Sequence, residues 1–80
     1  MSNILLKIKS ILKKKFNIKK KYIMKNANFI SDLGLDSLDK IELLMEFEKK
    51  FNIEISDEIS EKINSVNQAE KYIKKIINKL

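Results

Sequence analysis

The sequence predicts an all-α protein: a small four-helix bundle with three main helices, one short helix and a long loop after the first helix. Two segments, near the beginning and the end of the chain, repeat apolar residues at the spacing of one helical face. A third segment, in the middle, has a still broader apolar surface. Alternation typical of a strand is confined to Ile53 and Ile55, which is too short for an independent sheet. With 80 residues, 44% of them hydrophobic, we expect one domain spanning residues 1–80.

The first helix is expected over residues 3–15, with Ser2 as its N-cap. Lysines fall mostly between the apolar residues of its buried face, which are Ile4, Leu5, Ile8, Ile11, Leu12 and Phe16. Residues 17–35 show no clean period, and loops of this length are usually functional or disordered. We expect an ordered loop, because apolar residues are available to anchor it to the core: Ile18, Tyr22, Ile23, Phe29, Ile30 and Leu33.

The second helix is expected to follow Asp36, a good N-cap, and to run to about Lys50, with Gly34 in the preceding turn. Its apolar side chains span an arc of roughly 220°, wider than the stripe of a surface helix. They are Leu38, Ile41, Leu43, Leu44, Met45, Phe47 and Phe51. We therefore expect a central helix that packs on two sides. The opposite side carries a narrow acidic ridge, formed by Asp39, Glu42 and Glu46.

Two further helices complete the predicted bundle. A short helix is expected near residues 57–62, opened by Ser56 or Asp57. The segment "SVNQ" fits a capping box, with Ser65 as the N-cap and Gln68 at the third position. The last helix then has a regular apolar face, formed by Val66, Ala69, Tyr72, Ile73, Ile76, Ile77 and Leu80.

The charged residues are distributed unevenly along the chain. The net charge is +6, but residues 1–30 carry nine lysines and no acid, whereas residues 31–61 carry ten acids and three lysines. All 17 basic residues are lysine, and the absence of arginine weakens a nucleic-acid interpretation. Lysine, isoleucine and asparagine make up 39 of the 80 residues, and all three have codons rich in A and T. An AT-rich genome would therefore explain much of the basic charge.

Catalysis by this chain alone is improbable. It contains no histidine and no cysteine, so the common general base and the soft-metal ligands are both missing, and we expect no metal site. Ser37 therefore has no histidine to activate it, and a lysine base would need a buried site that the sequence does not indicate. At the first position of a helix, however, its hydroxyl lies beside unpaired N–H groups and the positive end of the helix dipole, a favourable place for a phosphate. Ser37 is thus a candidate acceptor of a phosphorylated group.

The segment "FISDLGLDSLDKIELLMEFEKKFNIEI", residues 29–55, resembles the acyl carrier protein family, with "DSL" at residues 36–38 as the modification motif. The segment "MSNILLKIKSILKKKF" resembles the family's first helix, and "SDEISEKINSVNQAEKYI" resembles its third and fourth helices. The resemblance covers essentially the whole chain. It is carried by an extended pattern, which is more specific than the tripeptide alone.

The resemblance implies a four-helix bundle without catalytic activity. It implies that a holo-acyl-carrier-protein synthase transfers 4′-phosphopantetheine from coenzyme A to Ser37 in a magnesium-dependent reaction. The arm would carry growing fatty acyl chains as thioesters and deliver them to fatty-acid synthesis enzymes and acyltransferases. A chain without cysteine needs such an arm, because it cannot supply the thiol itself.

The resemblance also assigns further residues. Acidic positions that match docking residues for basic partner patches are Asp36, Asp39, Glu42, Glu48, Asp57 and Glu61, and matching apolar contacts are Leu38 and Met45. Acyl chains in the family enter between the second and third helices, so the candidate pocket residues are Phe29, Leu43, Phe47, Ile55 and Ile63. Each of these is expected to be a packing residue first.

The chain departs from the family that it resembles in its basic charge. Lys40, Lys49 and Lys50 lie within the docking helix, and Lys49 stands where an acid is common. We expect weaker docking to enzymes of an ordinary bacterium than to its own partners. A carrier of amino acids or of secondary metabolites is the serious alternative. A basic membrane-binding or nucleic-acid-binding protein is a remote one. We expect a monomer in a bacterial cytoplasm, with a plastid as the other possible home, and no nucleic-acid partner or stable membrane association.

Overall fold

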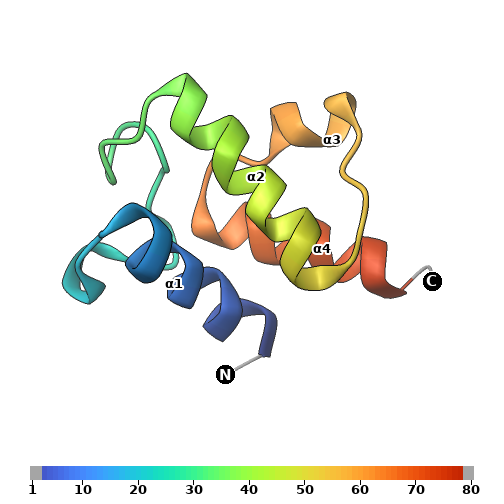
Figure 1. Cartoon of the computed structure of the whole chain (residues 1–80), viewed down its shortest axis with the longest axis horizontal. Coiled ribbons are helices and arrows are strands. Elements are labelled where there is room, and N and C mark those ends of the chain that lie inside the picture. The colour runs from blue at the N-terminus through green and yellow to red at the C-terminus, as the bar shows by residue number, and fades with distance from the viewer. Residues whose placement is uncertain (1–2, 79–80) are drawn as a thin grey trace.

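Three long helices and one short helix form a bundle in the computed structural model, which describes residues 3–78 (Figure 1). The elements are α1 (Asn3–Phe16), η1 (Lys20–Tyr22), α2 (Ser37–Phe51), α3 (Asp57–Lys62) and α4 (Val66–Asn78), where η1 is a single 3-10 turn. No strand occurs within residues 3–78; one isolated bridge pairs Asn28 with Ser65. The predicted fold class is confirmed, and Ser2 and Leu80 lie outside the described residues.

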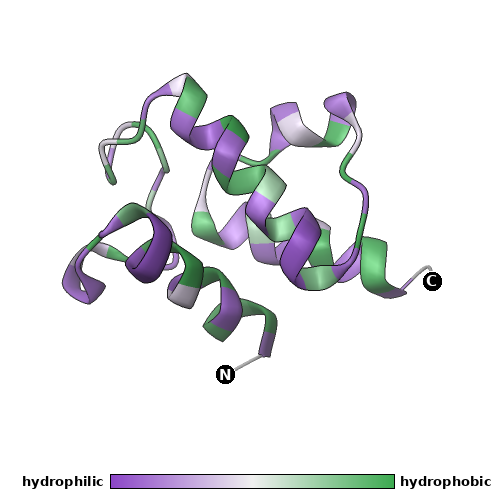
Figure 2. Ribbon diagram, viewed as in Figure 1, coloured by the Kyte–Doolittle hydropathy of each residue, from purple (hydrophilic) through white to green (hydrophobic). Residues whose placement is uncertain are grey.

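The core draws side chains from every α-helix or its flanking residues and from the long loop. The Phe29 and Phe47 rings, from the loop and from α2, lie 6.4 Å apart between centroids. Each fully buried large side chain contributes about 1.5–3 kcal/mol of transfer free energy. Figure 2 shows apolar and polar residues recurring along each helix, as expected where one face of a helix is buried. The largest fully buried side chains are Ile8, Leu12, Phe29, Leu43, Phe47, Ile63, Val66 and Ile73.

The loop of residues 17–35 is ordered, as predicted, around Asn28. The Asn28 Oδ1 atom accepts hydrogen bonds from the N–H groups of Ile30 and Ser31, at 2.9 and 3.0 Å. The Asn28 N–H donates to Asp32 Oδ2 at 2.7 Å. The prediction that Tyr22 and Ile30 anchor the loop to the core is wrong, because their side chains are 53% and 46% exposed. The buried residues of the loop are Ile23, Ala27, Phe29 and Leu35.

Both α1 and α2 end one residue beyond the predicted ends, at an asparagine in the left-handed conformation. Asn17 has φ 55° and Asn52 has φ 54°. The same five residues, "KKFNI", occur at 14–18 and at 49–53, so one sequence makes both helix ends. After α2, the Ile53 N–H donates to the Glu48 carbonyl oxygen at 3.1 Å, the bond of a Schellman motif.

The second helix is not packed on two sides, contrary to the prediction. Leu43, Leu44 and Phe47 are buried against the bundle. The three apolar residues on the other side of the arc are exposed: Leu38, Ile41 and Met45. The helix that follows α2 in the chain has only six residues, which is too few to cover this second side.

The short helix α3 begins and ends as predicted, and the Ser56 Oγ atom caps it by accepting from the Ile59 N–H at 3.2 Å. The predicted capping box of α4 is only half formed. Ser65 Oγ accepts from the Gln68 N–H at 3.2 Å, but Gln68 Oε1 accepts from the Asn64 N–H instead of the Ser65 N–H. The neighbouring backbone is held by the long loop, since the Phe29 N–H donates to the Asn64 carbonyl oxygen.

Candidate functional site

Ser37 is the first residue of α2 and its side chain is exposed. Asp36 is the N-cap, as predicted, and its Oδ1 atom accepts from the Asp39 N–H at 2.7 Å. The Asp39 Oδ2 atom accepts in return from the Asp36 N–H at 3.2 Å. This reciprocal capping box fixes the helix start, and with it the backbone position of Ser37. Within residues 3–78, that hydroxyl makes no hydrogen bond to another protein group.

The turn before Ser37 depends on Gly34, which has φ 75°. Apart from Gly34 and its two chain neighbours, no atom of residues 3–78 lies within 4 Å of the position that a Cβ atom would occupy there, so glycine is required by its backbone conformation and not by crowding. The N–H of Leu35 donates to the Phe29 carbonyl oxygen at 3.0 Å, and the Leu35 side chain is buried. The turn therefore anchors the residue before Asp36 and leaves Ser37 at the surface.

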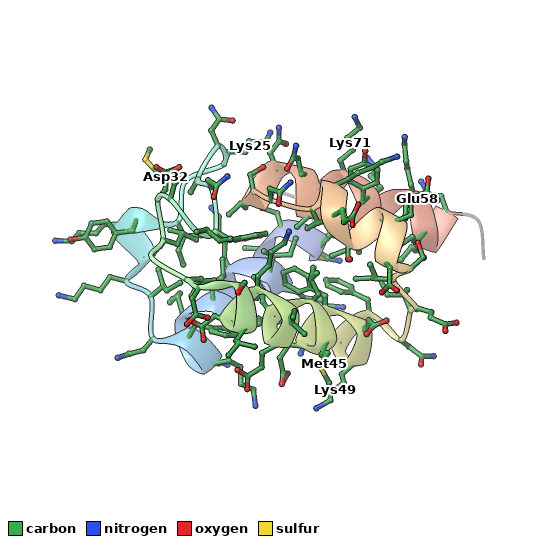
Figure 3. All side chains as sticks on the ribbon, turned by 90° about the horizontal axis from the view of Figure 1, so that it is seen from above. Lys25, Asp32, Met45, Lys49, Glu58 and Lys71 are labelled. Carbon is green, nitrogen blue, oxygen red and sulfur yellow. The ribbon has the colours of Figure 1, made fainter. Side chains whose placement is uncertain are left out.

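An apolar stripe runs along α2 from the residue after Ser37. It consists of Leu38, Ile41 and Met45, which are 74%, 57% and 51% exposed. Figure 3 shows Met45 on the outer side of α2, with Lys49 beside it. Leu38 and Met45 were also predicted as surface contacts, but Ile41 was placed only in the apolar arc that was expected to pack on two sides. The spacing of residues 38, 41 and 45 places them on one face of the helix. The sequence does contain one sign that this face is exposed: the predicted neighbouring helix, α3, is too short to cover it.

A groove of about 270 Å³ separates this stripe from α3. It brings together four of the predicted site residues, Met45, Glu48, Ile55 and Asp57. Ile41, Leu44 and Ser60 complete its lining. We call it the α2–α3 groove.

Three predicted docking acids also have structural contacts. Asp36 and Asp39 form the capping box, and the Glu48 Oε2 atom accepts from the Ile55 N–H at 2.8 Å. Glu48 thereby holds the segment between α2 and α3 against α2. Glu42, Asp57 and Glu61 are exposed. The docking role of all six acids stays a prediction.

The predicted acyl-pocket residues occupy the filled core. Phe29, Leu43, Phe47 and Ile63 are each 0% exposed, and Ile55 is half-buried. Ile55 is the one member of this set that lines the α2–α3 groove. An acyl chain that reached the other four would have to displace packed side chains, so their role as a pocket stays a prediction.

Asn64 connects four parts of the molecule, and sequence reasoning did not identify it. Lys40, in the first turns of α2, donates its Nζ proton to Asn64 Oδ1 at 2.7 Å. The Asn64 side chain also donates to the Glu61 carbonyl oxygen at 3.0 Å, and its backbone binds Phe29 and Gln68. Lys40 and Asn64 are 24 residues apart, so no local pattern could have paired them.

The site can hold a prosthetic group on a long arm. The exposed Ser37 oxygen is available for a phosphoester, and the start of a 15-residue helix favours an anion. The apolar stripe offers a surface to the rest of the arm. Asp36 and Asp39 oppose a phosphate near Ser37, which is a reason for the arm to point away from the protein.

The fold and the site, a small helical bundle with an exposed serine at the start of its second helix, are those of covalent carrier domains. The model of the family described as phosphopantetheine attachment site matches residues 6–73. Relatives named acyl carrier protein include one from Karelsulcia muelleri (strain GWSS), 54% identical over 98% of this chain and 94% of the relative. Another, from Buchnera aphidicola subsp. Schizaphis graminum (strain Sg), is 51% identical over 91% of this chain and 92% of the relative.

The chain belongs to the acyl carrier protein family. This confirms the resemblance inferred from the sequence. Members of this family are carriers and not catalysts, and they carry phosphopantetheine and work with fatty-acid synthesis enzymes. No helix within residues 3–78 is both long and apolar enough to cross a membrane.

Proposed function

We propose that Ser37 is the attachment point of 4′-phosphopantetheine and that this chain carries acyl groups in fatty-acid synthesis. The observation that carries the proposal is the position of Ser37: it is exposed, first in α2, and adjacent to the apolar stripe. When bound, the group supplies a thiol on a flexible arm, to which acyl groups attach as thioesters. The Asp36–Asp39 capping box holds the backbone to which the arm would be attached.

The surface around Ser37 supports docking to basic partners. Asp36 and Glu42 are exposed beside the apolar stripe, which supplies contact area close to the serine. We infer that a holo-synthase, fatty-acid synthesis enzymes and acyltransferases bind here through lysine and arginine patches. Opposite charges of this kind raise the rate of encounter more than the final affinity. The relatives are bacterial proteins, and we propose a bacterial cytoplasm as the site of action.

The test is the intact mass of the protein before and after incubation with coenzyme A, magnesium and a broad-specificity phosphopantetheinyl transferase. We expect the mass of one phosphopantetheine to be added to the parent and to Ser31→Ala, a control at another exposed serine. We expect no addition to Ser37→Ala. Loading of Ser37→Ala, or no loading of the folded parent by a transferase that is active on another carrier, would contradict the proposal.

A further inference from the structure

A basic groove lies at the end of α2 opposite to Ser37. Its volume is about 310 Å³, and its lining is Ser10, Ile11 and Glu46 together with four lysines, Lys14, Lys15, Lys49 and Lys50. The lysines are exposed, whereas Ile11 is buried and lies at the base. One acid faces them, and its Oε1 atom is 4.0 Å from Lys49 Nζ. Four ammonium groups therefore face one carboxylate.

The four lysines come from the two copies of "KKFNI", in the last turns of α1 and α2. The C-terminus of a helix carries a partial negative charge of about half a unit, which offsets part of this positive charge. The Glu46 carboxylate offsets one of the four positive charges, and the end of α2 offsets about half a charge more. The groove thus remains positive at the end of a helix whose beginning is acidic.

The groove is poorly suited to a phosphate group. Among the described residues, no helix begins in the lining of this groove, so it lacks the free N–H groups that bind phosphate at the start of a helix. Lysine also lacks the planar fork with which arginine binds phosphate. Separate carboxylates on a peptide can instead pair with the ammonium groups one at a time.

The basic groove continues the surface that carries Ser37. Lys49 follows Met45, the last residue of the apolar stripe, by about one helical turn (Figure 3). Ser37 and Lys49 are separated along α2 by about 18 Å, from a rise of about 1.5 Å per residue. A protein that docks on the stripe is large enough to cover both ends of α2.

We propose that the basic groove binds an acidic segment of the protein that docks at Ser37; the identity of that protein as an acyl-processing partner rests on the proposed function. The partner then has two charged surfaces. A basic patch surrounds the entrance to its active site, and an acidic segment lies about 18 Å away, at the spacing set by α2. This pattern distinguishes the partner from one with basic patches alone.

Titration of the isotope-labelled, folded protein with hexaglutamate at low ionic strength, followed by NMR, tests the groove directly. We expect the largest amide shifts at Ser10, Ile11 and Glu46. A variant with Lys14→Gln, Lys15→Gln, Lys49→Gln and Lys50→Gln should bind at least about tenfold more weakly, as expected for the loss of several exposed charge pairs. The matched control removes four lysines elsewhere, with Lys20→Gln, Lys21→Gln, Lys71→Gln and Lys74→Gln, and should change the dissociation constant by less than about twofold.

Three results would overturn the inference. They are equal weakening in the two variants, shifts spread over all lysine-rich surfaces, or tighter binding of tripolyphosphate than of hexaglutamate. If the groove variant unfolds, the double change Lys14→Gln and Lys49→Gln replaces it, compared with Lys21→Gln and Lys74→Gln. Loading of Ser37 in both variants is measured separately by intact mass, so a failed groove and a failed attachment site give different results.

Discussion

Three carboxylates near the start and end of α2 have a structural contact as well as a predicted docking role. Asp36 and Asp39 cap each other's N–H groups, and Glu48 accepts from the Ile55 N–H. Glu42, by contrast, is exposed, and within the described residues 3–78 no such contact ties it to the fold. The effect of a substitution on docking therefore has to be separated from its effect on stability, residue by residue.

Glu48 and Glu42 make a matched pair for this separation. Glu48→Ala should lower the free energy of unfolding by about 1–2 kcal/mol, because it leaves the Ile55 N–H without its acceptor. Glu42→Ala should change it by less than about 0.5 kcal/mol, as exposed substitutions usually do. Urea denaturation measures both values. Equal losses in the two variants would show that the hydrogen bond contributes nothing to stability.

At the scale of the elements, the two copies of "KKFNI" end both long helices that flank the basic groove. Each copy places asparagine in the left-handed conformation and lysines in the last turn, where they complement the helix dipole. The same short sequence thus sets the helix ends and supplies the charge of the groove.

Asn52 tests whether the left-handed conformation limits stability. Asn52→Ala should lower the free energy of unfolding by about 1–2 kcal/mol, because alanine is strained at positive φ. Asn52→Gly should cost nothing or stabilise slightly, since glycine adopts this conformation readily. Thermal and urea unfolding distinguish the two. A loss of the same size in both variants would mean that the asparagine side chain, and not the backbone, is responsible.

At the scale of the whole molecule, the charges are separated in space as they are in sequence. The acidic residues lie mainly on α2 and α3 and in the loop between them, whereas lysines dominate α1, the long loop and α4. Such a separation orients the molecule as it approaches a charged partner. It presents the start of α2 to basic surfaces even though the net charge is +6.

Loading of Ser37 should therefore slow as salt is added. Raising ionic strength from about 0.01 to about 0.15 M shortens the screening length from about 30 to about 8 Å, so charge attraction fails over most of the approach. With a basic phosphopantetheinyl transferase, the rate at limiting protein concentration should fall several-fold. The rate at saturating concentration serves as the control. A rate that does not depend on salt would show that the acidic surface has no part in the encounter.

Local sequence was sufficient to predict the start of α2, since Asp36, Ser37 and Asp39 act within one turn. It was also sufficient to predict α3 and the buried faces of α1 and α4, because an N-cap and a three- or four-residue spacing of apolar side chains are both local features of the chain. It failed for Ile41, because whether an apolar residue is buried depends on which neighbour covers it. It failed for Asn64, whose partners come from four separate segments. For Asn17 and Asn52 the sequence shows only the repeat of "KKFNI", which does not by itself indicate that the backbone is in the left-handed conformation.

The bridge between the long loop and the start of α4 has a consequence for the order of synthesis. Residues Lys25, Ala27 and Phe29 exchange backbone hydrogen bonds with residues 64–67. A ribosome must therefore translate α2 and α3 completely before the loop that leads to Ser37 meets its partners. A chain translated only through α3 therefore lacks the partners that anchor this loop, whereas the Asp36–Asp39 capping box lies within one turn and does not depend on them.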